Sequence, residues 1–204
     1  MALIRPSVEL VHITPDSEFL LEKAIRVCYN SFDKCDGTIE CARKLIKKII
    51  SMWHVDTLEH ATATFKIVCS RAAMAQFTRH RLASFGVESQ RYVRYEEAEA
   101  IEVPEELGIE LYERFVEEAY YTYNILINAF SWKKENARGV LPQFGTTQFY
   151  VTMNFRSWRH FISLRSEKSA QWEIRGLSDE ILKILLSEAP SVFEDLLEEV
   201  SGGK

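Results

Sequence analysis

The chain has 204 residues, of which 47% are hydrophobic and 12% aromatic, so it can bury one sizeable core. Its formal net charge of −5 argues against a general nucleic-acid binder, which is normally basic. No window approaches the roughly 20 apolar residues that a membrane span needs, and residues 1–15 lack the apolar core of a signal peptide. We therefore expect a cytoplasmic protein that binds neither nucleic acid nor membrane.

The first half of the chain is predicted to begin with a strand and two helices. Residues 8–14 alternate and are rich in valine, isoleucine and threonine, which favours a strand. Residues 17–29 follow a helical pattern. Thr38 is placed to cap the next helix, whose apolar positions run at helical spacing from Ala42 to Trp53. Because repeats, low-complexity tracts and Gly/Ser linkers are absent from the sequence, we expect one domain over residues 1–204.

The remaining elements begin with the clearest strand, residues 61–69, which alternates strictly. Ser70 is expected to cap a short helix over 71–81, and a loop or edge strand follows through 84–93. A long amphipathic helix is predicted over 109–132, with two more over roughly 147–165 and 178–199. These elements predict an α+β fold, a helix-rich domain around a small, mainly antiparallel sheet. The alternative is a parallel α/β fold, but the strands do not alternate regularly with helices.

One arginine cluster lies in residues 79–91, "RHRLASFGVESQR", which contain no lysine. The planar guanidinium bonds two oxygens at once, so this composition favours a phosphate-bearing ligand. If the preceding helix runs through residue 81, Gln76, Arg79 and His80 share one side of it. The alternative is a surface cluster of salt bridges with neighbouring glutamates.

A second cluster, residues 154–175, places arginines and histidines among bulky apolar side chains. On a continuous helix, Asn154 and Arg165 are close to three turns apart and share a face. Arg156 and His160, at i and i+4, share another. Such an arginine is either aimed at a ligand or paired with an acid, and Glu173 is an available partner.

Three further features of the sequence are weaker signals. "HVDTLEH" (54–60) holds two histidines and two carboxylates, but their spacing fits no usual zinc pattern, so we expect a cap or loop role with one or two ligand contacts. Gly-rich phosphate loops are absent from the sequence, so a bound dinucleotide must be held by arginines. No pair of cysteines has CxxC spacing, which predicts free thiols, with Cys69 in the core and Cys28 either structural or facing a pocket.

Together these motifs resemble those of the flavin-dependent thymidylate synthases. Arg79-His80-Arg81, seven further residues, Ser89, one residue and Arg91 fit the family hallmark. "LRSEKSAQWEIR" (164–175) resembles its second signature. "NARGVLP" (136–142) and "LEH" (58–60) occur in the matching order, so the resemblance spans about residues 24–190.

The resemblance implies an α+β enzyme that converts dUMP to dTMP with FAD, methylenetetrahydrofolate as carbon donor and NADPH as reductant. It also implies a homotetramer with active sites shared between subunits, and chemistry that needs no cysteine nucleophile. One residue is implied to be catalytic, by activating the uracil ring: Arg165. Eight residues are implied to touch the flavin: His54, Arg79, His80, Arg81, Glu88, Asn154, Arg156 and His160. Eight are implied to hold dUMP: Gln76, Arg79, Glu88, Ser89, Gln90, Arg91, Arg138 and Arg165.

The sequence also departs from the family pattern. Where the family commonly has Asn-Glu, this chain has Gly86 and Val87, and the carboxylate is Glu88, directly before the serine. On an extended segment this shift of one reverses the side on which the carboxylate lies, unless a bulge restores it. Asp56 and Cys28 stand where hydroxyl residues are common. Two rival functions stay open: a non-catalytic nucleotide- or RNA-binding protein, and a related enzyme with another folate or acceptor.

Overall fold

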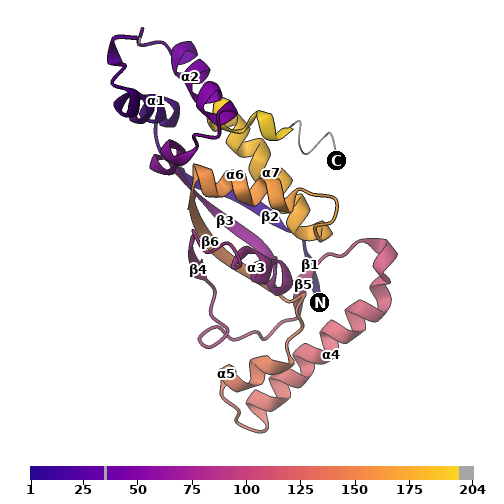
Figure 1. The fold of residues 1–204 in the computed structure, drawn as a ribbon. Coiled ribbons are helices and arrows are strands. Elements are labelled where there is room, and N and C mark those ends of the chain that lie inside the picture. Colours follow the sequence, from indigo (N-terminus) through magenta and orange to yellow (C-terminus); the bar gives the residue numbers. More distant parts are fainter. Residues whose placement is uncertain (35, 198–204) are drawn as a thin grey trace. The chain divides into compact units, whose positions relative to one another are not determined.

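The computed structural model describes residues 1–34 and 36–197 and confirms the α+β class, with a small antiparallel sheet. Four strands are hydrogen-bonded in the order β2-β3-β6-β4, and β1 pairs with β5 in parallel as a separate ribbon (Figure 1). The elements in chain order are β1 (Ala2–Ile4), β2 (Ser7–Ile13), α1 (Ser17–Tyr29), η1 (Phe32–Lys34), α2 (Ile39–Ser51), η2 (Asp56–His60), β3 (Thr62–Ser70), α3 (Arg71–Phe77), β4 (Ser84–Val87), β5 (Glu99–Ile101), η3 (Glu105–Leu107), α4 (Ile109–Asn128), α5 (Lys134–Ala137), η4 (Arg138–Val140), β6 (Thr146–Asn154), α6 (Phe155–Arg165), α7 (Trp172–Glu188) and α8 (Pro190–Phe193).

The chain divides into two compact units. Unit 1 holds residues 1–7, 67–79 and 85–150, and unit 2 holds residues 8–66, 80–84 and the chain from Val151 onward. The single domain expected from the sequence stays a prediction. Two earlier predictions fall partly outside the described residues, namely the free thiol of Cys35 and the last two residues of the helix predicted over 178–199.

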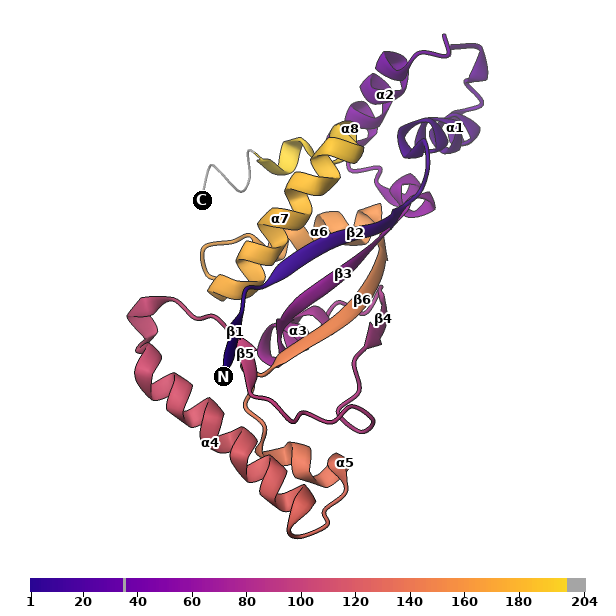
Figure 2. The same ribbon diagram turned by 180° about the vertical axis from the view of Figure 1, so that it is seen from behind.

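In unit 2, α6 packs on the sheet through Trp158. The indole N–H donates to the carbonyl oxygen of Ala63 at 3.0 Å, and the ring meets Phe65 edge-on at 5.1 Å between centroids. Figure 2 shows α6 and α7 side by side along β2 and β3. Helices α1, α2 and α8 form the other part of this core, which encloses a buried ion pair of Arg26 with Glu22 at 2.8 Å. The packing of Trp158 on β3 thereby fixes the position of α6 and of the arginines that α6 carries.

In unit 1, the long helix α4 is fastened to β5 by tyrosines. The hydroxyl of Tyr120 donates to the carbonyl oxygen of Glu99 and that of Tyr112 donates to Ile101, both at 2.8 Å. Burial raises the pKa of Tyr120 to about 12, so it remains a donor at neutral pH. On the sheet, Phe77 of α3 meets Phe149 of β6 at 5.2 Å between ring centroids.

Several sequence predictions are confirmed and others need correction. The strand over 8–14, the helix over 17–29 and the strand over 61–69 are present as β2, α1 and β3. Thr38 and Ser70 cap their helices, accepting from the backbone N–H groups of Cys41 at 3.2 Å and Ala73 at 3.0 Å. Cys69 is fully buried and Cys28 is exposed.

The predicted helix over 147–165 is wrong in its first half. Residues 146–154 form strand β6, whose side chains alternate between buried and exposed, and the helix begins only at Phe155. The prediction over 178–199 is also displaced, because α7 begins at Trp172 and ends at Glu188, and Pro190 starts the short helix α8. The alternation of apolar residues continues from β6 to Phe155, the first residue of α6, and this conceals the change of period.

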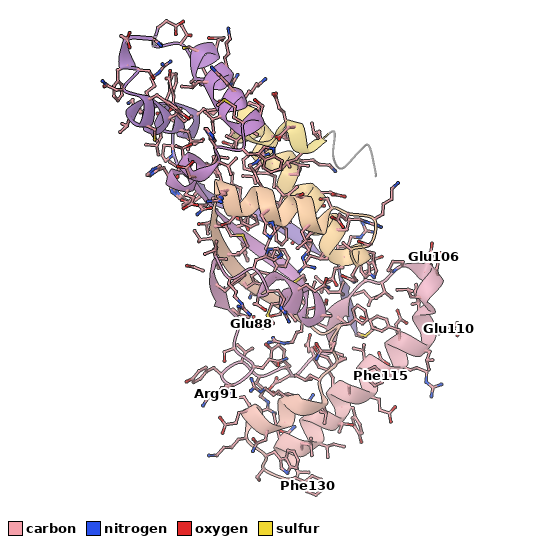
Figure 3. The ribbon with its side chains drawn as sticks, in the orientation of Figure 1. Glu88, Arg91, Glu106, Glu110, Phe115 and Phe130 are labelled. Atoms are coloured by element: carbon pink, nitrogen blue, oxygen red, sulfur yellow. The ribbon has the colours of Figure 1, made fainter. Side chains whose placement is uncertain are left out.

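The predicted apolar face of α4 is only partly buried. Val116, Ala119, Tyr120 and Tyr123 are buried, whereas Phe115 is 57% exposed. Phe130, inside the helix predicted over 109–132, lies beyond the end of α4 at Asn128 and is 66% exposed (Figure 3). None of the described helices combines the length and the apolar character needed to cross a membrane.

Candidate functional site

The Arg-His-Arg cluster does not lie on a helix, which corrects the sequence prediction. Helix α3 ends at Phe77 with Thr78 as its C-cap, so Arg79, His80 and Arg81 follow in the connection before β4. Gln76 is therefore the only predicted site residue on α3 itself, and the shared helix side proposed for Gln76, Arg79 and His80 does not form. Arg79 and Arg81 are both exposed, and neither pairs with an acid within the part of the chain that the structure describes.

His80 is the buried member of this cluster, with 9% of its surface exposed. Its Nε2 accepts a hydrogen bond from Nε of Arg165 on α6 at 3.1 Å. Its ring meets Phe161 at 4.9 Å and His160 at 5.8 Å between centroids. Burial, aided by the charges of Arg165 and His160, lowers the pKa of His80 from 6.5 to about 4. The imidazole is therefore neutral at pH 7, and since Nε2 is the acceptor, the proton lies on Nδ1.

The other predicted residues of α6 have different local roles. Asn154 is its N-cap, with the side-chain oxygen accepting from the backbone N–H of Ser157 at 2.8 Å. Arg156 is exposed and pairs with Glu59 of η2 at 2.6 Å. Arg159, from the same cluster, is a structural residue whose fork binds both carboxylate oxygens of Asp195.

The junction of α2 and β3 carries His54, whose Nδ1 lies 2.9 Å from the hydroxyl of Tyr29. The preceding residue, Trp53, has a φ of 60° and is 85% exposed. Tryptophan is strained in this left-handed region, and Trp53 lies beyond the end of α2 at Ser51, although the predicted helical pattern included it. Across residues 1–34 and 36–197, no three His, Cys, Asp or Glu side chains are arranged to hold a metal ion.

In unit 1, Glu88, Ser89, Gln90 and Arg91 lie on one loop after β4, here called loop 88–95 (Figure 3). The carboxylate of Glu88 is held within the protein. Oε1 accepts from the hydroxyl of Tyr95 at 2.6 Å and Oε2 from Nε2 of Gln148 at 3.0 Å. Arg91 pairs with Glu135 at 3.3 Å.

Arg138, also in unit 1, is exposed in η4, and its Nε donates to the carbonyl oxygen of Glu135 at 3.1 Å. The structure thus brings Glu88, Ser89, Gln90 and Arg91 together on one loop in unit 1, and His80, His160 and Arg165 together in unit 2. Sequence reasoning missed Tyr95, Gln148 and Glu135, because no motif marks them.

The comparisons with known proteins match this fold. Residues 9–191 match the family model described as "Thymidylate synthase complementing protein". The flavin-dependent thymidylate synthase of Corynebacterium diphtheriae is 36% identical over 199 residues, covering 88% of this chain and 79% of that protein. That of Geobacter sulfurreducens is 36% identical over 203 residues, covering 92% and 85%.

Solved structures agree. Thymidylate synthase X from Helicobacter pylori, solved with FAD and dUMP, superposes with a TM-score of 0.77 at 28% identity, covering 95% of this chain and 99% of that one. The UMP/dUMP methylase PolB of Streptomyces cacaoi superposes with a TM-score of 0.86 at 24% identity, covering 95% and 96%, and this likeness concerns the fold. The chain belongs to the flavin-dependent thymidylate synthase family. It is accordingly an enzyme of the methyltransferase class.

Proposed function

We propose that this protein catalyses the FAD-dependent reductive methylation of dUMP to dTMP, with methylenetetrahydrofolate as carbon donor and NADPH as reductant. The observation that carries this proposal is the family match over residues 9–191, together with the spacing of Arg79, Ser89 and Arg91 inside it. The Helicobacter pylori relative, solved with FAD and dUMP, supports the choice of cofactor and acceptor.

With the exception of Arg79 in unit 1, the side chains proposed here for the flavin lie in unit 2, and their chemistry fits FAD. A dinucleotide carries an anionic pyrophosphate, and Arg81 is an exposed cation without an acidic partner among the described residues. Arg156 is held by Glu59 in a half-exposed ion pair, which is worth only about 0–1 kcal/mol and leaves further N–H donors for a ligand. We propose that His54, Arg79, His80, Arg81, Asn154, Arg156 and His160 hold the flavin. When bound, FAD supplies the reducing equivalents of the reaction.

Loop 88–95 and its surroundings fit a small dianion. Ser89 offers a hydroxyl, Gln90 an amide and Arg91 an exposed guanidinium within three consecutive residues. Arginine forks are suited to phosphate oxygens. We propose that dUMP is bound by this segment together with Gln76, Arg79, Arg138 and Arg165.

Arg165 is the proposed catalytic residue. Uracil becomes a nucleophile at its ring carbon when negative charge develops through the N3–C4 amide, and a fixed cation at that edge stabilises this charge. Arg165 remains protonated at any working pH. Its Nε is anchored on the neutral ring of His80, which orients the guanidinium without neutralising its charge. A positively charged His80 would not accept this bond, so the lowered pKa supports the arrangement.

We also propose a cytoplasmic homotetramer with shared active sites. Large apolar side chains are exposed on α4, including Leu111 at 76% and Phe115 at 57%. Exposed apolar surface of this kind is typical of protein interfaces. The alternative, a nucleotide binder without catalysis, gives no role to the anchoring of the Arg165 guanidinium on the neutral ring of His80.

The experiment that separates an enzyme from a binder is the visible spectrum of the purified protein. We expect a flavin absorption band that bleaches with NADPH in the absence of oxygen. A colourless protein that takes up no FAD on soaking would contradict the proposal. A yellow protein that NADPH leaves oxidised would contradict the choice of reductant.

A further inference from the structure

Glu88 is one of the positions at which this chain departs from the family pattern, and its carboxylate is bonded within unit 1. The side chain is partly buried, and two uncharged donors point at its two oxygens, Tyr95 at 2.6 Å and Gln148 at 3.0 Å. The backbone N–H of Glu88 also donates to the carbonyl oxygen of Gln148 at 3.0 Å. The two bonds to the carboxylate of Glu88 are charge-assisted, and such bonds are roughly twice as strong as those between neutral groups.

The bond from Tyr95 closes the loop. Glu88 and Tyr95 are its first and last residues, so Ser89, Gln90 and Arg91 lie inside a ring closed by side chains. Burial, followed by the hydrogen bond to Glu88, raises the pKa of the Tyr95 hydroxyl far above its usual value. Tyr95 therefore keeps its proton and donates throughout the neutral range. Its ring also rests against Tyr123 of α4, at 6.4 Å between centroids.

Inside the ring, a tight turn shapes the segment. The carbonyl oxygen of Ser89 accepts from the backbone N–H groups of Tyr92 at 3.1 Å and Val93 at 2.9 Å. The hydroxyl of Ser89 accepts from the backbone N–H of Arg91 at 3.3 Å. A loop held in one conformation before binding loses less conformational entropy when its ligand binds.

A second set of contacts fixes the outer side of the loop to helix α5. Nζ of Lys134 donates to the carbonyl oxygen of Tyr92, and Glu135 pairs with Arg91. Loop 88–95 is thus held at Glu88 by Tyr95 and Gln148, and at Arg91 and Tyr92 by α5.

We infer that Glu88, Tyr95 and Gln148 are positioning residues that lock loop 88–95 in the conformation that presents Ser89, Gln90 and Arg91 to the nucleotide. This inference rests on the proposed binding of dUMP. It replaces the ligand contact that the family resemblance implies for Glu88. A carboxylate is an acceptor only, so it repels a phosphate and serves better as an acceptor for the two donors that close the loop.

The test compares Glu88→Gln, Tyr95→Phe and the double variant. Each single change should raise the KM for dUMP roughly tenfold, while kcat, bound flavin and the rate of flavin reduction by NADPH stay within about twofold. Because both changes act on the Tyr95–Glu88 bond, their effects should not add, and the double variant should be no worse than Glu88→Gln alone. Tyr112→Phe is the matched control. It removes a hydroxyl that donates to Ile101 elsewhere in unit 1 and should leave the KM unchanged.

Two outcomes would overturn the inference. Loss of bound flavin in Glu88→Gln but not in Tyr95→Phe would make Glu88 a cofactor ligand. Additive losses in the double variant would show that the two side chains act separately.

The rate of amide hydrogen exchange in the ligand-free protein tests the ordering of loop 88–95 without requiring any enzymatic activity. Tyr95→Phe should accelerate exchange at Tyr92 and Val93, whereas Tyr112→Phe should not. If the wild-type protein made no dTMP, the proposed function would fail while this measurement still decided the lock. Unchanged exchange at both amides would refute the lock itself.

Discussion

Acid should destabilise this protein through His80. The folded pKa of about 4 lies below the ordinary value of 6.5, mainly because the ring is buried. Between these two pH values the unfolded chain binds a proton that the folded chain does not. The free energy of unfolding is therefore complete above about pH 6.5 and falls as the pH drops towards 4. The gap between the two pKa values corresponds to about 3 kcal/mol, a large share of the roughly 5–15 kcal/mol that stabilises a typical protein.

Urea denaturation of the wild type and of His80→Gln, at several pH values between 4 and 7.5, measures this effect. Glutamine keeps an acceptor for Arg165 but does not titrate, and the carboxylates that also titrate in this range are common to both proteins. The free energy of unfolding of the wild type should therefore fall by about 3 kcal/mol more than that of the variant. Parallel curves, with a constant difference at every pH, would refute the buried neutral ring.

Four further predictions concern the site and the assembly. Arg165→Ala should keep its flavin and the reduction by NADPH but lose dTMP formation roughly 100-fold or more. Unchanged turnover per flavin with a lower melting temperature would instead mean a structural role. Asn154→Ser should keep α6 capped yet weaken flavin binding, whereas Asn154→Ala should also lose about 0.5–2 kcal/mol of stability; equal flavin affinity in all three proteins would remove Asn154 from the site. Phe115→Glu should yield species smaller than a tetramer in light scattering and Phe115→Leu should not, so equal masses would exclude this surface from the interface. Replacing all cysteines by serine or alanine should leave methylation measurable, and complete loss in a folded, yellow variant would reveal thiol chemistry at one of Cys28, Cys35, Cys41 and Cys69.

The features that the sequence predicted well depend on neighbouring residues. Strand β3 is recognisable because Ala63, Phe65 and Ile67 alternate with polar residues and are fully buried. The caps Thr38 and Ser70 act on N–H groups three residues ahead, so their role is written in the local sequence.

The wrong predictions concern elements whose bounds depend on residues far away in the sequence. Phe149, Val151 and Met153 alternate as in a strand, but this alternation continues to Phe155 in α6, and only pairing within the sheet separates the two elements. No residue type marks the end of α3 at Phe77, so the helix seemed to carry Arg79 and His80.

The candidate site shows the same limit. The spacing from Arg79 to Arg91 is local and could be matched to a family. The bond between His80 and Arg165 joins residues 85 positions apart, and that between Glu88 and Gln148 spans 60. Such pairs form only when the chain folds, so neither the hydrophobic period of the sequence nor a local motif predicts them.

The central claim is the methylation of dUMP, and the formation of dTMP tests it most directly. Purified protein would be incubated without oxygen with dUMP, FAD, methylenetetrahydrofolate and NADPH, and the nucleotides separated by chromatography. We predict dTMP in the complete mixture and none when dUMP, the folate, the flavin or the reductant is left out. A flavin-loaded protein that makes no dTMP from the complete mixture, or dTMP formed without any flavin, would contradict the account.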